Sequence, residues 1–256
     1  MSSPVLKTAL GDRLSMGHTV MNRSDAVTRD SVITATLAAL SVCVLCGVGT
    51  IMLGLKVNPE LATMANYVGC GGTLLMFLVL SFSPSMRRKA KIPTFILAVF
   101  QGLMLGGFTF SIGSYDIQGV PGWNLVGQAL VGTVALFFVA LFLYYSGAIR
   151  VTSGFTKFIM FSVASFGILY AANFAWAIFS GKNLLMSDGP IPIIIGVVAI
   201  ILGTLTLIQD FDTIDNMVEA GSPKEAQWAL AAGLVSSLVW LYMEILRVLF
   251  LIARQR

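Results

Sequence analysis

The chain has 256 residues, of which 57% are hydrophobic and 11% are charged, with 16 basic and 12 acidic residues and a formal net charge of +4. In soluble domains about a quarter of the residues are charged, so this composition excludes an ordinary soluble protein and indicates an integral membrane protein. Basic residues in such a chain report its orientation in the bilayer, and they give no reason to expect nucleic acid as a partner.

The first 30 residues are polar and mixed in charge, whereas apolar runs dominate residues 31–256. The start of the chain has no apolar core behind a basic segment, so it does not read as a cleavable signal peptide. We therefore expect a loose polar tail over 1–30 and a single transmembrane domain over 31–256. Asp30 or Ser31 is the expected cap of the first helix.

Seven apolar runs follow, and each is long enough, or nearly so, to cross a hydrocarbon core that takes about 20 helical residues. These runs are 31–55, 61–83, 92–112, 123–146, 158–179, 193–209 and 228–253. The sixth helix should continue through Asp210 towards Ala220, because Gly221 and Pro223 supply a stop. The sequence predicts an all-α, polytopic bundle of seven transmembrane helices.

Lysine and arginine are divided unevenly between the two sets of loops. The tail and the loops after the second and fourth runs hold Lys7, Arg13, Arg23, Arg29, Arg87, Arg88, Lys89, Lys91, Arg150 and Lys157. The opposite loops hold only Lys56 and Lys182. The positive-inside rule therefore predicts a cytoplasmic N-terminus, although Arg254 and Arg256 favour the cytoplasm for the far end.

Glu244 lies deep within the last apolar run. A carboxylate in hydrocarbon costs at least a few kcal/mol and usually marks an ion or proton path. Arg247, three residues later, could instead neutralise it as a local structural pair. Ser237 shares the helix face of Glu244, so it is a candidate pore-lining residue. The other candidates are the amides Gln101, Gln128 and Asn173, and all of these polar groups could equally serve as interhelical hydrogen bonds.

Several enzyme and metal-binding classes fail on inventory. His18 is the only histidine and lies in the tail, which excludes clustered zinc ligands and a Ser-His protease. The last run has no lysine for a retinal Schiff base. The acidic segment that begins at Asp210 has Ile214 in the fifth position and lacks the EF-hand glycine in the sixth. We expect neither an enzyme nor a bound cofactor.

Two short motifs resemble the Bax inhibitor-1-like, or transmembrane Bax inhibitor motif, family. Asp210 to Ile214 matches an Asp-x-x-x-Ile pattern in the sixth helix of that family, and Leu241 to Glu244 matches Leu-Tyr-x-acid in the seventh. Met86 to Lys89 resembles the basic end of its second helix. The resemblance covers nearly all of 31–254, and 128–133 and 149–152 resemble bacterial branches, which implies a bacterial inner (cytoplasmic) membrane.

The resemblance implies a bundle with the last helix at its centre and a pH-sensitive calcium leak governed by an acidic pair. The pair would be Asp210 with Glu244, with Asp212 in reserve, and the arginine latch of the family would fall on Arg87. Two carboxylates in a low-dielectric site resist ionising together and can share a proton, and once ionised they attract a hard cation such as calcium. A turn at Ser222 places Asp210 about 18 Å and Glu244 about 33 Å from it, so tilt or a kink would have to bring the two level.

Two other functions remain open. The protein could be a non-conducting regulator that binds other membrane proteins, such as a membrane protease. It could also be a proton-coupled transporter with Glu244 as carrier, but no substrate-shaped cluster of polar groups accompanies that residue. The expected partners are the lipid bilayer and calcium or other cations, and the regulator alternative adds other membrane proteins.

Overall fold

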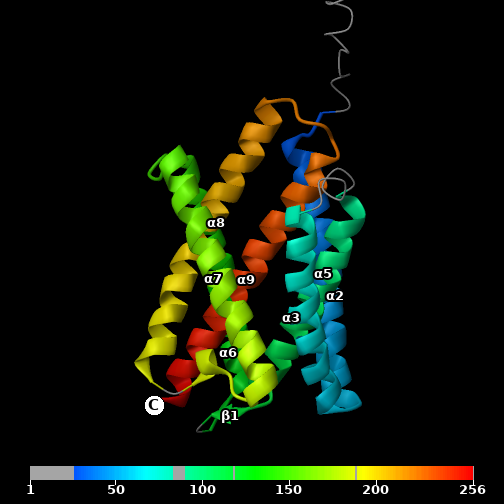
Figure 1. Cartoon of the computed structure of the whole chain (residues 1–256), viewed down its shortest axis with the longest axis vertical. Helices are drawn as coiled ribbons and strands as arrows, with labels where there is room; N and C mark the ends of the chain where they lie inside the picture. The colour runs from blue at the N-terminus through cyan, green and yellow to red at the C-terminus, as the bar shows by residue number, and fades with distance from the viewer. Residues whose placement is uncertain (1–25, 83–89, 118, 188, 256) are drawn as a thin grey trace, which may run out of the picture.

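The computed structural model describes residues 26–82, 90–117, 119–187 and 189–255. Within these ranges seven helices are long and apolar enough to cross a membrane, which confirms the predicted fold class. They are α2 (Arg29–Lys56), α3 (Pro59–Phe82), α5 (Lys91–Gly113), α6 (Gly122–Tyr145), α7 (Ser153–Ser180), α8 (Pro190–Glu219) and α9 (Ala226–Arg254). Figure 1 shows them as one elongated bundle.

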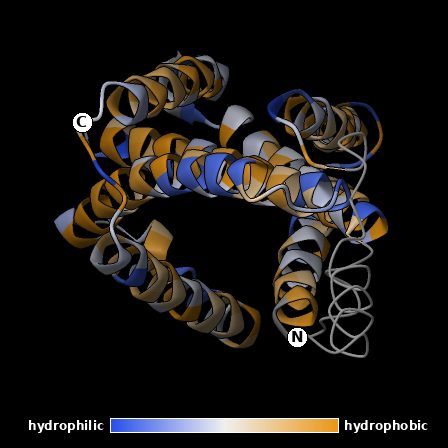
Figure 2. Ribbon diagram, turned by 90° about the horizontal axis from the view of Figure 1, so that it is seen from above, coloured by the Kyte–Doolittle hydropathy of each residue, from blue (hydrophilic) through white to orange (hydrophobic). Residues whose placement is uncertain are grey.

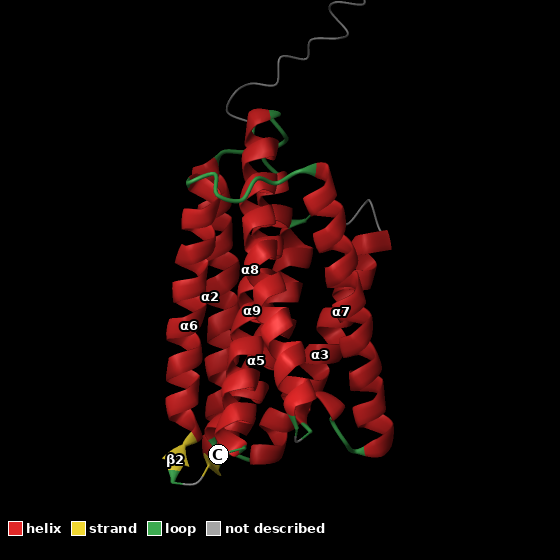
Figure 3. Ribbon diagram, turned by 90° about the vertical axis from the view of Figure 1, so that its left-hand side faces the viewer, coloured by secondary structure: helices red, strands yellow, loops and turns green. Residues whose placement is uncertain are grey.

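The connections between the helices gather at the two ends of the bundle (Figure 3). One end carries the loop between α8 and α9 at Ser222, and we call it the Ser222 end. The other end carries the connection between α7 and α8 and a small antiparallel hairpin. The hairpin consists of two strands of two residues each, β1 (Asp116–Ile117) and β2 (Val120–Pro121). That connection contains the 3-10 helix η2 (Leu184–Met186). We call residues 181–187 the strap and this end the strap end.

The helix boundaries agree with the predicted runs to within about three residues, except that α7 begins at Ser153 where the sequence predicted 158. The start of the first helix is informative. The first helix begins at Arg29, so the expectation of a cap at Asp30 or Ser31 is wrong. Thr28 caps the helix instead, because its extended backbone lets its hydroxyl accept a hydrogen bond from the Ser31 N–H, and the Ser31 hydroxyl in turn accepts one from the Thr28 N–H. This reciprocal pair is a capping box. As predicted, the sixth helix continues to Glu219.

The residues that precede the first helix are tied to the Ser222 end. The Val27 N–H donates to the Ser222 carbonyl at 2.8 Å, and Ala26 forms an isolated antiparallel bridge with Pro223. The described part of the predicted tail is therefore ordered and held against the loop between α8 and α9.

The last helix, α9, lies at the centre of the bundle and contacts α2, α5, α6 and α8. In Figure 1 it crosses between the group formed by α2, α3 and α5 and the pair formed by α7 and α8. In its most apolar 18-residue stretch 67% of the residues are buried, the largest share among the described helices. The central position implied by the family resemblance is confirmed.

Helices α2, α3 and α5 pack closely on one another. At Gly106 of α5, an added Cβ would collide with the backbone carbonyl of Gly47 on α2, so only glycine permits this approach. Small residues drive helix association in lipid because burying apolar side chains gains little there. Many large hydrophobic residues are exposed on the bundle, which suits contact with acyl chains, and Figure 2 shows that hydrophobic residues predominate along its helices.

Helix α7 lies at the periphery. In its most apolar 18-residue stretch only 6% of the residues are buried. Of the α7 residues, all of which the structure describes, Ile159 alone is fully buried. Its position therefore depends on a small number of contacts, several of which belong to the site described next.

Candidate functional site

Glu244 sits within α9 with 3% of its surface exposed. Its Oε2 atom lies 2.6 Å from Nη2 and 3.1 Å from Nε of Arg247, one helical turn further along. Its Oε1 atom accepts a hydrogen bond from the Tyr170 hydroxyl of α7. The local pair that the sequence left open as a structural alternative is therefore formed, and the charge of Glu244 is matched inside the protein.

Arg247 is 4% exposed and reaches three parts of the structure at once. Besides Glu244, its Nη1 donates to the Leu185 carbonyl of the strap at 3.2 Å, and its Nη2 lies 3.3 Å from the Tyr170 hydroxyl. Gly196 of α8 makes room for Val248 and for the guanidinium, because an added Cβ there would collide with Cγ2 of Val248 and lie 3.2 Å from Nη2 of Arg247. The five N–H donors of an arginine suit such a shared position.

Aromatic rings surround the pair on the side of α7. The Phe166 ring lies 6.2 Å from the rings of both Tyr170 and Trp240, measured between centroids. Trp240 is one turn before Glu244 on α9, and its buried indole N–H has no hydrogen-bond partner within the described ranges. These rings exclude water around the ion pair, which strengthens its electrostatic attraction.

Asp210 forms a second polar site, between α8 and α9. Its Oδ2 atom accepts a hydrogen bond of 2.6 Å from the Ser237 hydroxyl. The neighbouring Ser236 accepts a hydrogen bond of 2.7 Å from the Gln101 amide of α5. Two consecutive serines on α9 thus connect it to two helices, Ser236 to α5 and Ser237 to α8. Two of the candidate pore-lining residues, Gln101 and Ser237, therefore lie at the same level of the bundle.

The two carboxylates are separated along α9. Ser237, which binds Asp210, precedes Glu244 by seven residues, or about 10 Å of helix. Among the described residues no hydrogen bond joins Asp210 to Glu244, and each has its own partners. They therefore form two separate carboxylate sites along the central helix, as the unequal depths in the sequence suggested, rather than one pair that shares a proton.

Asp212 and the missed residue Asp215 face the Ser222 end. Asp212 accepts a hydrogen bond from Asn216 at 2.7 Å, and both carboxylates line a hollow of about 380 Å³ beside Tyr144. Asp215 binds Arg29 and the Tyr144 hydroxyl at 2.8 and 2.9 Å. Asp212 therefore joins neither of the two buried sites.

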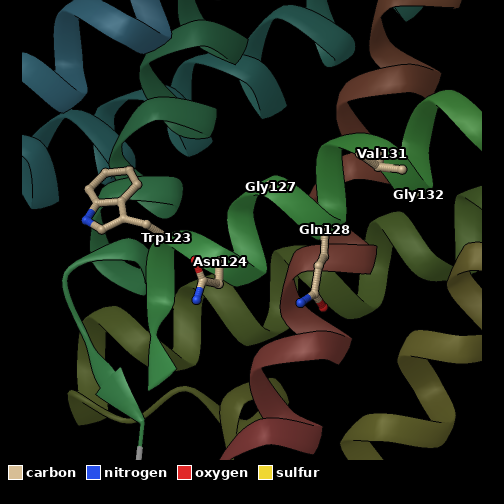
Figure 4. A pocket seen from close by; sticks show the side chains of 6 residues that line it. All are labelled: Trp123, Asn124, Gly127, Gln128, Val131 and Gly132. Atoms are coloured by element: carbon tan, nitrogen blue, oxygen red, sulfur yellow. The ribbon is translucent and has the colours of Figure 1, made fainter. Parts of the chain in front are cut away.

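The remaining candidates lie elsewhere. Gln128 is on an exposed face of α6, where it lines a hollow of about 650 Å³ together with Trp123 and Asn124 (Figure 4). Asn173 holds the strap, because its side-chain oxygen accepts hydrogen bonds from the backbone N–H groups of Leu184 and Leu185. Arg87, the expected latch, lies outside the described residues.

Sequence reasoning missed Tyr170, the one α7 side chain that bonds to Glu244. Its span is apolar without a helical stripe, so nothing in the pattern distinguished this tyrosine from the neighbouring aromatic residues. A weak signal was available, because a buried tyrosine hydroxyl needs a hydrogen-bond partner.

The residues present allow only limited metal chemistry in this arrangement. No three His, Cys, Asp or Glu side chains come together within the described ranges. The Oδ1 atom of Asp210 accepts no hydrogen bond there either, so it is an available oxygen ligand. Both oxygens of Glu244 already have partners, Tyr170 and Arg247.

Together, the fold and the two carboxylate sites define a multi-pass α-helical membrane protein with a buried carboxylate on its central last helix and a half-buried one on α8 beside it. Residues 5–254 match the family described as Bax inhibitor 1 like, and the chain belongs to this family. No curated protein matches the chain.

Proposed function

We propose that this protein is a slow, pH-sensitive cation leak, with calcium as the favoured ion, in which Asp210 and Glu244 are the gating carboxylates. The observation that carries the proposal is a glutamate buried inside a membrane span, whose charge is matched by Arg247 of the same helix. Intramembrane carboxylates usually mark ion or proton paths. We further propose a bacterial inner membrane, because 128–133 and 149–152 resemble bacterial branches of the family. In this proposal the N-terminus lies in the cytoplasm, because the basic residues favour that side.

In this proposal the structure corresponds to a closed state. A cation that enters from the Ser222 end first meets the free oxygen of Asp210, since hard cations prefer carboxylate and hydroxyl oxygens. It can use Glu244 next only if it displaces the guanidinium of Arg247. The internal cation thus competes with the transported one, which keeps the leak slow.

The proposed pH sensitivity follows from the same two carboxylates. Protonation removes the negative charge that binds a cation, and at Glu244 it also removes the attraction for Arg247. A change of pH therefore alters both the ion sites and the contact that closes them. No chemical reaction is part of this proposal.

The test is calcium flux into liposomes that contain the purified protein, stepped from about pH 6 to about pH 8. We expect wild-type flux to follow pH, and Glu244→Gln or Asp210→Asn to flatten that dependence. Glu60→Gln is the matched control, because Glu60 is exposed and far from both sites in sequence. Flux that stays at the level of empty liposomes at every pH would contradict the proposal.

One observation favours a second candidate, a non-conducting regulator of other membrane proteins. Glu244 is fully satisfied by Arg247 and Tyr170, as expected for a structural ion pair. If this candidate is right, Glu244→Gln leaves flux at background, and the wild-type protein co-purifies with a membrane protein partner, such as a protease, after cross-linking in membranes.

A further inference from the structure

Helix α7 packs on α8 with few buried residues, and its described side-chain contacts with α9 are polar and aromatic. Ile159 is its one fully buried residue among those described, yet the helix reaches α9 through Phe166 and Tyr170. Segments with few buried contacts have low local stability, so the loss of one or two bonds moves them readily. The Tyr170 contact with Glu244 therefore has a large share in fixing α7.

The strap is tied to both helices. On the α7 side, Asn173 accepts from the backbone of Leu184 and Leu185 at 3.0 and 3.3 Å. On the α9 side, Arg247 donates to the Leu185 carbonyl, and Arg254 donates to the Met186 carbonyl at 2.9 Å. Gly181, with φ at +68°, begins the strap in a left-handed conformation that lets it turn sharply off the end of α7.

Arg247 connects these contacts to the charge of Glu244. Its guanidinium bonds to Glu244 on α9, approaches the Tyr170 hydroxyl of α7, and bonds to the Leu185 carbonyl of the strap. The groups that face Glu244 are the Tyr170 hydroxyl from α7 and, from its own helix, the guanidinium of Arg247 and the indole N–H of Trp240. Helix α8 presents Gly196 to that guanidinium. The Glu244 carboxylate thus accepts hydrogen bonds from both Tyr170 and Arg247 and keeps the two donors in place.

We propose that Tyr170 and Arg247 are positioning residues that hold α7 and the strap against α9 only while Glu244 carries its negative charge. Neutralising Glu244, by a proton or a bound cation, removes the charge that strengthens both hydrogen bonds and takes one of the two carboxylate oxygens away as an acceptor. Both bonds are then weakened, and α7 and the strap are freed to move away together. This inference rests on the proposed function, since it identifies the moving part of the gate. Hydrogen bonds to a charged group are strong enough that their loss changes the population of the released state by about tenfold or more.

The test measures the position of α7 directly. The full chain, with Cys43, Cys46 and Cys70 replaced by alanine, is spin-labelled at Ile168 of α7 and at Leu45 of α2, which are both exposed. Pulsed electron paramagnetic resonance in lipid nanodiscs then measures the distance between the two helices. We expect one main distance in this background and a second, longer one in Glu244→Gln.

Two further variants make the result specific. Tyr170→Phe removes the hydroxyl and leaves the Glu244–Arg247 pair intact, so it should also populate the longer distance, and it decides the matter if Glu244→Gln does not fold. Ser165→Ala is the matched control on α7, because the Ser165 hydroxyl bonds only to the Phe161 carbonyl of its own helix. It should leave the distance unchanged.

The outcomes separate this inference from the leak. A single unchanged distance in Tyr170→Phe and in folded Glu244→Gln overturns the positioning role, even if calcium flux depends on Glu244. A longer distance in both variants, with flux at background, supports the positioning role and removes the leak. A shift of equal size in Ser165→Ala also overturns it, because α7 would then respond to any change in its own residues.

Discussion

Helices α7 and α9 are of similar length and are both apolar, yet they occupy opposite environments. In their most apolar stretches 6% of the residues of α7 are buried, against 67% for α9. Lipid tails are as apolar as leucine, so hydrophobic composition alone does not draw a helix into the bundle. Burial in a membrane protein follows from packing and polar contacts, and α7 has mainly the latter.

The largest effect on α9 is expected when the positive charge of Arg247 is removed from its centre. Arg247→Met leaves the buried Glu244 without a positive charge beside it, with only the Tyr170 hydroxyl as a partner, and should cost about 3–5 kcal/mol of stability. Unfolding in detergent micelles, followed by circular dichroism, measures the loss. The double variant Glu244→Leu with Arg247→Met should recover most of it, since well-packed apolar residues often replace a buried pair at little cost. A single variant as stable as the double one would contradict the importance of the pair.

Truncating leucine-sized side chains on the two helices tests their packing. Leu246 of α9 is 0% exposed, whereas Ile168 of α7 is 72% exposed. Leu246→Ala should lower the free energy of unfolding by about 2–4 kcal/mol, because it leaves a cavity. Ile168→Ala should stay within about 0.5 kcal/mol of the wild type. Equal losses for the two variants would mean that α7 is packed in solution in a way the structure does not have.

The hydroxyl of Ser237 provides a smaller change on α9. Ser237→Ala removes the hydrogen bond to Asp210, and a bond to a charged acceptor contributes about 1.5–3 kcal/mol. We expect a loss in that range by the same unfolding measurement. Ser41→Ala is a suitable control, because the Ser41 hydroxyl is exposed and bonds only to the Leu37 carbonyl of its own helix. An equal loss for both variants would show that Asp210 gains nothing from Ser237.

The smallest expected effect concerns the end of α7. Asn173→Ala removes the acceptor for the Leu184 N–H, which corresponds to about 1 kcal/mol locally, whereas the Leu185 N–H keeps the Asn183 side chain as an acceptor. Hydrogen exchange of the Leu184 amide should become about five- to tenfold faster, while amides within α9 keep their rates. Unchanged exchange at Leu184 would show that Arg247 and Arg254 hold the strap without help from α7.

Much of the fold could be predicted because the bilayer sets the length of every span. The seven runs, the extension of the sixth helix to Glu219 and its stop before Gly221 all follow from local composition. The cap at Thr28 was missed because it depends on the extended backbone of that residue, which the sequence does not display. The Glu244–Arg247 pair was visible as an alternative at a spacing of three, but Tyr170 was not visible at all.

The sequence by itself determined that this is a multi-pass membrane protein with a carboxylate in its last span, since hydropathy, charge and spacing are local properties. It also indicated the family, through the motif Asp210–Ile214 in the second half of α8 and the motif Leu241–Glu244 within α9. Tertiary structure alone decided that Asp210 binds Ser237, and that Glu244 binds Tyr170 and so joins α7 to α9. These contacts join residues far apart in the chain. Which residues meet depends on how the helices tilt and how closely they approach one another, and glycines such as Gly196 permit that close approach. The pattern of a single span does not record it.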